Sequence, residues 1–163
     1  MISIRRIRSG EGSTLREVRL AALLDTPSAF GRSHDEETQF PAEEWEQRAS
    51  AWSEGVVGAT FFAERADGDG AAVVGLVGAH RPGDGTVELV SMWSAPEARG
   101  AGVGRALVQA VLEWAGDDQV WLWVTRGNDP ALRLYQRCGF VTTGDFQPLP
   151  SDPCKDEIRM CMG

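Results

Sequence analysis

Apolar residues recur with the helical period in some segments of this chain and alternate with polar residues, as in a strand, in others. The changes from one pattern to the other predict its helices and strands. Over residues 13–24 the apolar positions have helical spacing. A second helix is expected over 41–52, with Pro41 at its first position and acidic residues in its first turn. The segment 28–40 between them is polar, with isolated aromatic residues, and is expected to be a connection. The first part of the chain is therefore predicted to be helical on both sides of a polar linker.

Strand patterns dominate the remainder. Asp67–Gly70 is a strong hairpin signal, and Asp129 and Pro130 are expected as the N-cap and first residue of a late helix. The segments with strand character are 2–8, 56–65, 71–80, 86–94, 120–124, 140–146 and 156–162, and the later helices cover 103–114 and 129–137. The order β-α-α-β-β-β-α-β-α-β-β, without repeats or a linker between domains, predicts one mixed α/β layer structure.

Length and composition fit a single domain over 1–163. The chain has 42% hydrophobic and 25% charged residues, which is ordinary for a globular protein with its own core. Its first residues lack the apolar run of a secretory signal, and no stretch of about 18 apolar residues could span a membrane. A cytoplasmic location without membrane association is the expectation.

Histidine and cysteine are too few and too scattered for a metal centre. The three cysteines have no CxxC spacing, and the two histidines, His34 and His80, are far apart in sequence. We therefore expect no metal site and no disulfide framework.

The net charge of −8 disfavours binding to nucleic acid. Much of the acid lies in two clusters, Asp35, Glu36, Glu37, Glu43, Glu44 and Glu46 in the first, and Asp152, Asp156 and Glu157 in the second. Two interpretations stay open: the clusters serve solubility, or one of them borders a site for an amine-bearing substrate.

The stretch Glu88–Gly104 carries the clearest chemical signal. An apolar strand leads through a Pro-containing turn into a glycine-dense loop with Arg99 and Arg105, and an amphipathic helix follows at once. Glycines let backbone N–H groups approach a ligand, and a helix N-terminus adds partial positive charge. The layout predicts a cradle for a phosphorylated ligand.

The spacing of the glycines narrows the class of ligand-binding loop that this segment can form. A Walker loop needs GxxxxGK followed by Ser or Thr, which is absent, and a dinucleotide fingerprint needs GxGxxG in a βαβ unit. Gly100, Gly102 and Gly104 give GxGxG instead, after segments that indicate antiparallel hairpins. Alone, this spacing is also compatible with a tight strand-to-helix turn or with a nucleotide-binding module.

The wider pattern resembles the GCN5-related N-acetyltransferases, the GNAT superfamily. The run RGAGVGRAL from Arg99, preceded by Pro96, is similar to the family's acetyl-CoA-binding motif, with Arg99, Gly102 and Gly104 at the motif positions. The segment NDPALRLYQRCGF, residues 128–140, resembles the family's second signature. The element order agrees over essentially the whole chain.

The resemblance implies a fold and a coenzyme site. The fold is a central, mostly antiparallel sheet of six to seven strands with a splayed parallel pair, flanked by about four helices. The strand before the loop carries a bulge near its end, where the pantetheine arm of coenzyme A pairs like an added strand. The implied contacts to acetyl-CoA are Met92, Trp93, Ser94, Arg99, Gly100, Ala101, Gly102, Val103, Gly104, Arg105, Asn128 and Tyr135. From the residues alone, Asn128 can also be interpreted as a turn or capping residue.

The resemblance also implies direct attack of an amine on acetyl-CoA in a ternary complex. Tyr135, the only tyrosine, is the expected general acid for the departing thiolate. Glu88 is the expected general base, acting directly or through water; the alternatives are that Glu88 only pairs with an arginine and that His80 is the base.

The acceptor site is expected in regions 24–52 and 146–156, which hold aromatic residues beside carboxylates. This suits a cationic, partly apolar amine, a small molecule rather than a protein, although protein N-termini or lysines stay open. Trp45 and Trp52, seven residues apart, are also compatible with a buried helix face. A non-catalytic acyl-CoA-binding sensor on the same fold is the alternative function, and a homodimer is an open alternative for assembly.

Overall fold

The computed structural model describes residues 1–163 and contains one seven-stranded sheet with the order β1-β2-β3-β4-β5-β7-β6. Neighbouring strands are antiparallel except for β4 and β5, which are parallel. The strands are β1 (Ile2–Arg6), β2 (Gly58–Asp67), β3 (Gly70–His80), β4 (Thr86–Ser94), β5 (Gln119–Thr125), β6 (Phe140–Leu149) and β7 (Asp152–Met162). The expected mostly antiparallel sheet with one parallel pair is confirmed.

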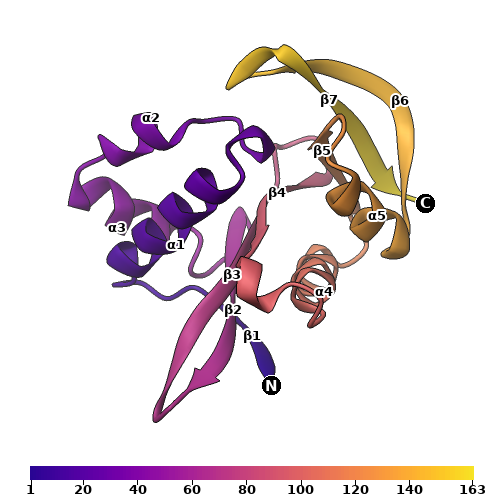
Figure 1. Cartoon of the computed structure of the whole chain (residues 1–163). Coiled ribbons are helices and arrows are strands. Elements are labelled where there is room, and N and C mark those ends of the chain that lie inside the picture. Colours follow the sequence, from indigo (N-terminus) through magenta and orange to yellow (C-terminus); the bar gives the residue numbers. More distant parts are fainter.

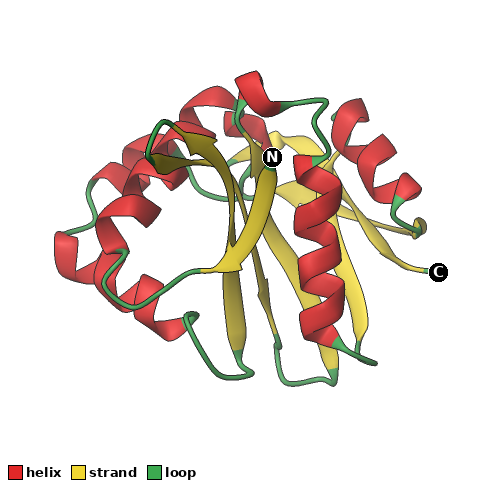
Figure 2. Ribbon diagram, turned by 90° about the horizontal axis from the view of Figure 1, so that it is seen from below, coloured by secondary structure: helices red, strands yellow, loops and turns green.

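Helices cover both faces of this sheet. They are α1 (Gly12–Asp25), α2 (His34–Thr38), α3 (Ala42–Ala51), α4 (Val103–Ala115) and α5 (Asp129–Arg137), with 3₁₀ turns at Pro27–Ala29 and Pro96–Ala98. Figures 1 and 2 show α1, α2 and α3 on one side of the sheet and α4 on the other, with α5 beside α4. There are five α-helices where about four were expected. No helix is both long and apolar enough to cross a membrane.

The additional helix is α2, inside the segment 28–40 that was predicted to be a connection. Its five residues are too few to show a helical hydrophobic period. A capping signal was present all the same, because Ser33 stands three residues before Glu36 and its side chain accepts a hydrogen bond from the Glu36 backbone N–H at 3.2 Å. The prediction was wrong here because a short helix depends on its cap rather than on an apolar face.

The predicted cap of α5 was one residue out of place. Asn128, not Asp129, is the N-cap, and its side-chain oxygen accepts a hydrogen bond from the Ala131 backbone N–H at 3.4 Å. Asp129 instead begins the helix, where its negative charge interacts favourably with the positive end of the helix dipole.

The last hairpin is longer than the sequence predicted. Residues 140–146 and 156–162 were expected as strands, but β6 continues to Leu149 and β7 begins at Asp152. Leu149 pairs with Asp152 at the tip. The extra residues are mostly polar and include prolines, so they lack the alternation by which strands are recognised. The extension brings the hairpin tip towards the helical layer.

The parallel pair separates partway along its length, as the family resemblance implied. Pairing between β4 and β5 runs from Thr86 opposite Gln119 to Leu89 opposite Leu122, and then ends. Beyond that point β4 pairs only with β3, and β5 pairs only with β7. The diverging ends therefore leave one edge of each strand without a strand partner.

A bulge lies in β4 at the start of this separation. On β3 the register advances two residues, from Leu76 to Gly78, while on β4 it advances three, from Val90 to Trp93. Ser91, inside the bulge, has a φ of 59°, which is rare for a residue other than glycine. The bulge turns the end of β4 away from β5, so the strand separation has a local cause.

Candidate active site

The glycine-rich loop forms a turn into the N-terminus of α4. Gly100 and Gly102 have φ values of 84° and 82°, a conformation that side chains with a Cβ rarely adopt. Gly102 is the N-cap, so the helix begins at Val103 with backbone N–H groups that have no partner within the helix. Those groups and the helix dipole make this turn suitable for an anion, in agreement with the sequence analysis.

The third glycine of the motif has a different role. A Cβ at Gly104 would lie 2.8 Å from Cδ2 of Leu134, a residue of α5. Gly104 therefore allows close packing of α4 against α5. The sequence motif could not separate this role from close approach to a ligand.

Arg99 is engaged within the protein. Its guanidinium donates to the Ser94 carbonyl at 3.1 Å and forms an ion pair with Asp25 at the end of α1. Asp25 also accepts a hydrogen bond from Nε1 of Trp93 at 3.0 Å, and this bond, with the pairing to Arg99, lowers the pKa of Asp25. The side chain of Arg99 thus links the loop to α1 and β4, whereas Arg105 is exposed on the first turn of α4.

Tyr135 lies on α5, the helix that packs against the start of α4. Its side chain is buried and its ring packs edge-on against Phe140, with 5.8 Å between ring centroids. Burial raises the pKa of Tyr135 above its ordinary value of 10.0, with a smaller contribution from Cys138. The hydroxyl therefore keeps its proton throughout the neutral range, as a proton donor requires.

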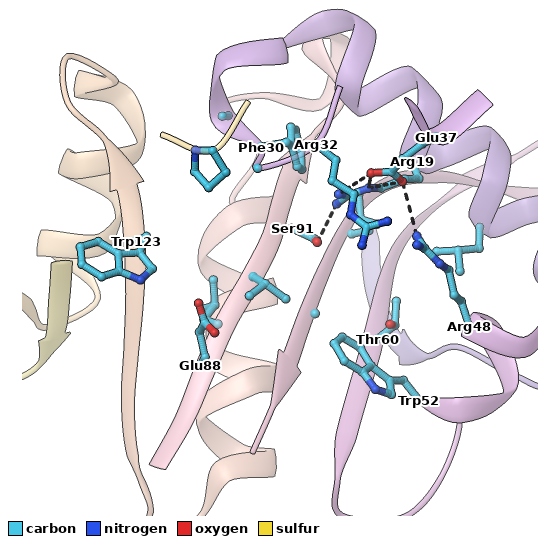
Figure 3. Close-up of a pocket in the computed structure, with 18 of the residues that line it drawn as sticks. Arg19, Phe30, Arg32, Glu37, Arg48, Trp52, Thr60, Glu88, Ser91 and Trp123 are labelled. Atoms are coloured by element: carbon cyan, nitrogen blue, oxygen red, sulfur yellow. Dashed lines mark hydrogen bonds and ion pairs between the residues drawn. The ribbon is translucent and has the colours of Figure 1, made fainter. Parts of the chain in front are cut away.

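A pocket of about 620 Å³ adjoins the diverging strands (Figure 3). Its walls come from the sheet on one side and from α1, the loop before α2, and α3 on the other. The lining residues that matter to the chemistry are Arg19, Phe30, Arg32, Glu37, Trp45, Arg48, Trp52, Glu88, Ser91, Trp123 and Glu157. The expected acceptor regions 24–52 and 146–156 both contribute to the lining, so the structure brings them together.

The two candidate bases are in direct contact. His80 and Glu88 are opposite each other on β3 and β4, and Nε2 of His80 lies 2.9 Å from Oε1 of Glu88. The His80 ring stacks on Trp52, with 5.8 Å between centroids and 16° between planes. The alternative that Glu88 pairs with an arginine was wrong, because its side-chain partner is His80.

Glu157 from the second acidic cluster is a further carboxylate in this part of the pocket. It lies on β7 and accepts a hydrogen bond from Nε2 of Gln147 at 2.6 Å. Burial raises the pKa of Glu157; the hydrogen bond from Gln147 opposes the rise, and the negative charge of Glu88 adds to it. The sequence placed Glu157 among nine clustered acids but gave no reason to prefer it.

Arginines form the part of the site that sequence reasoning missed. Arg19 on α1 contacts Glu37 at 2.9 Å and donates to the Ser91 hydroxyl at 2.6 Å (Figure 3). Arg48 approaches the same carboxylate at 3.6 Å, and Arg32 makes no ion pair. The partners of Arg19 are 18 and 72 residues away, so no local pattern could reveal this network.

The two tryptophans of the helical region, Trp45 and Trp52, have different roles. Trp45 is 1% exposed and belongs to the core, as a buried helix face predicts. Trp52 follows the end of α3 and is partly exposed in the pocket, where it supports His80.

Residues 20–140 match the model of the Acetyltransferase (GNAT) family, and the chain therefore belongs to that family.

Two curated relatives show similarity in sequence. A mycothiol acetyltransferase of Geodermatophilus obscurus is 35% identical over 148 residues, covering 83% of this chain and 47% of the relative. A streptothricin acetyltransferase of Streptomyces lavendulae is 36% identical over 88 residues, covering 52% of this chain and 46% of the relative. The chain thus spans about half the length of these two relatives.

A solved structure agrees over nearly the whole fold. The spermidine N-acetyltransferase of Vibrio cholerae, crystallised with CoA and spermine, superposes with a TM-score of 0.75 at 20% identity, covering 99% of this chain and 94% of that one. This likeness establishes the arrangement of helices and strands.

Proposed function

We propose that this protein transfers an acetyl group from acetyl-CoA to a primary amine of a small molecule. The observation that carries the proposal is the opening between β4 and β5 beyond Leu89 and Leu122. A glycine-rich helix N-terminus lies on one side of this opening, and a pocket with paired acid–base side chains lies on the other. A donor and an acceptor could therefore meet from opposite sides.

The residues present fit the coenzyme. N–H groups of the turn from Arg99 to Arg105, in the conformation that Gly100 and Gly102 allow, would hold the pyrophosphate. The edge of β4 at Met92–Ser94 has no strand partner on the side of β5 and would pair with the pantetheine arm. The side-chain amide of Asn128 retains N–H donors, because only its oxygen caps α5. When bound, acetyl-CoA would supply an acetyl thioester to this opening.

The side chains then have separate proton-transfer roles. We assign the acceptance of the amine proton to the Glu88 carboxylate with His80 as its hydrogen-bond partner. A backbone N–H near Trp93 or Ser94 would stabilise negative charge on the carbonyl oxygen. Tyr135 would donate the proton of its hydroxyl to the leaving sulfur. No covalent acyl-enzyme is required.

The experiment is an acetyl-CoA turnover screen over amines, amino acids and N-terminal peptides that measures release of free thiol. We expect amine-dependent thiol release, together with a thermal shift by coenzyme A that ATP and NAD do not produce. Binding of coenzyme A without thiol release over the whole panel would favour the sensor function. Protection by ATP or NAD instead of coenzyme A would overturn the coenzyme assignment.

A further inference from the structure

The pocket is electrically polarised, because its helical end has more arginines than carboxylates. Arg19, Arg32 and Arg48 line this end, and Glu37 is the one carboxylate among the lining residues there. Arg19 pairs with Glu37 and Arg48 pairs with Glu44, so one positive charge, that of Arg32, is left without a carboxylate. We propose that the acceptor carries a carboxylate as well as its amine, and that this carboxylate binds at the arginine end. This inference rests on the proposed acetyltransferase function and specifies its substrate class.

Two of the arginines are fixed by protein partners. Arg19 makes a two-pronged contact with Glu37, from Nε at 3.0 Å and Nη2 at 2.9 Å, while its Nη1 donates to Ser91. Arg48 donates to Glu44 at 3.2 Å and stands over the Phe40 ring. These contacts hold both guanidinium planes in place while each retains N–H groups for a ligand.

Arg32 is the arginine free to bind a ligand. Its guanidinium lies 5.5 Å from the centroid of the Phe40 ring and has no carboxylate partner. Figure 3 shows it extending into the pocket between the Arg19–Glu37 pair and Trp52. A planar guanidinium binds a carboxylate through two parallel hydrogen bonds, a geometry that an ammonium group does not match.

Trp45 adds to the surplus of donors at this end. The residue lines the pocket, and its indole Nε1–H is buried without a hydrogen-bond acceptor. An unpaired N–H dipole in a poorly solvated site raises the positive potential around it.

The sheet end of the pocket has the opposite character. Glu88 and Glu157 are the lining carboxylates there, and the proposed base contact with His80 is at the same end. Glu88 and Ser91 are three residues apart on β4, at most about 10 Å because the bulge at Ser91 shortens the strand, and Ser91 accepts a hydrogen bond from Arg19. The acceptor is therefore an amino acid-like molecule whose amine and carboxylate are separated by several bonds. A polyamine would place a positive charge against the arginines.

Matched ligands test this directly. The series consists of ω-amino acids of about four to eight carbons, chosen to match the strand spacing, with their carboxamides and the diamines of equal length. Binding is measured by titration calorimetry in the presence of coenzyme A, and acetylation is measured by thiol release. We expect at least one ω-amino acid to bind about 10–100-fold more tightly than its carboxamide, the range for loss of charged hydrogen bonds.

Substitution of Arg32 identifies the binding group. Arg32→Gln should abolish the preference for the carboxylate over the carboxamide, Arg32→Lys should restore part of it, and Arg32→Glu should shift selectivity towards the diamines. Arg16→Gln is the matched control, because Arg16 is exposed on α1 and lies outside the pocket lining. It should leave binding unchanged.

The outcomes separate this inference from the proposed function. Two results would overturn the inference: equal binding of ω-amino acids and carboxamides, or a carboxylate preference that survives Arg32→Gln. If other amines are acetylated in either case, the transferase function still holds. A carboxylate preference in calorimetry without thiol release supports the anion site and counts against catalysis.

Discussion

Nε2 of His80 lies 2.9 Å from Oε1 of Glu88 across the β3–β4 ladder. Glu88 lines the pocket, and the His80 ring is stacked on Trp52, so the hydrogen bond and the stacking together restrict the orientation of the Glu88 carboxylate. Two groups that the sequence offered as rival bases are therefore one unit. A proton taken up by one member can be shared with the other.

Substitution of this pair should show non-additive losses. We expect Glu88→Gln to lower kcat by roughly 10²–10⁴-fold, since it removes the proposed proton acceptor. His80→Gln should also lower kcat, and the double substitution should cost little more than the larger single loss, as for residues that act as a unit. The measurement is kcat at saturating substrates across pH.

The exposed carboxylate Glu17 provides the control, and Glu17→Gln should leave kcat unchanged. Two losses that multiply in the double variant would mean that His80 and Glu88 act separately. A Glu88→Gln profile with the same pH-dependent rise as the unsubstituted enzyme would remove Glu88 from the role of base.

Tyr135→Phe should lower kcat by roughly 10²–10⁴-fold if the hydroxyl is the general acid. The variant keeps the aromatic ring that packs on Phe140, so the melting temperature and coenzyme A affinity should change little. Steady-state kinetics and coenzyme titration measure these quantities. An unchanged kcat with both substrates saturating would exclude Tyr135 as the acid.

Glu37→Ala should strongly destabilise the fold. Glu37 is 0% exposed and pairs with Arg19, whose side chain is 14% exposed, so its removal leaves a mostly buried guanidinium without a carboxylate, whereas Arg48 keeps Glu44. The expected loss in the free energy of unfolding is about 3–5 kcal/mol, measured by urea denaturation. The adjacent Glu36 is exposed, and Glu36→Ala should cost less than about 1 kcal/mol. Equal losses for the two variants would contradict the assignment of Glu37 as the structural partner.

Glu157→Gln should stabilise the protein in a pH-dependent way. Because burial raises the pKa of Glu157 in the fold, the folded state binds this proton more tightly than the unfolded state does. The stability that protonation contributes is present below the unfolded pKa and is lost as pH rises through the folded pKa. The neutral glutamine avoids this loss, so its advantage should be largest above the folded pKa and fade as pH falls to 4.5, the ordinary pKa of a glutamate.

Urea denaturation of Glu157→Gln and the unsubstituted protein between pH 4 and 8 measures this difference. Glutamine can still accept the hydrogen bond from Gln147, so the comparison isolates the charge. A destabilised variant at pH 7, or an advantage that does not depend on pH, would contradict the prediction.

Elements with a clear local pattern were predicted well. Strand β4 was expected over 86–94 and is observed at Thr86–Ser94, because its apolar run is bounded by turn residues. Helix α4 was expected over 103–114 and ends one residue later. Helix α2 and the tip of the last hairpin were missed, because a short capped helix and a polar strand extension have no apolar period of their own.

The sequence by itself determined the glycine-rich turn at the start of α4, the proposed coenzyme site. Gly100, Gly102 and the start of α4 are contiguous, and local conformation and the helix dipole follow from contiguous residues. Only the tertiary structure decided the pocket beside the diverging strands, where we propose that the acceptor binds. Its decisive contacts join Arg19 to Glu37 and to Ser91, and the second of these spans 72 residues, so they exist only where the packing of α1 and α2 against β4 brings the side chains together.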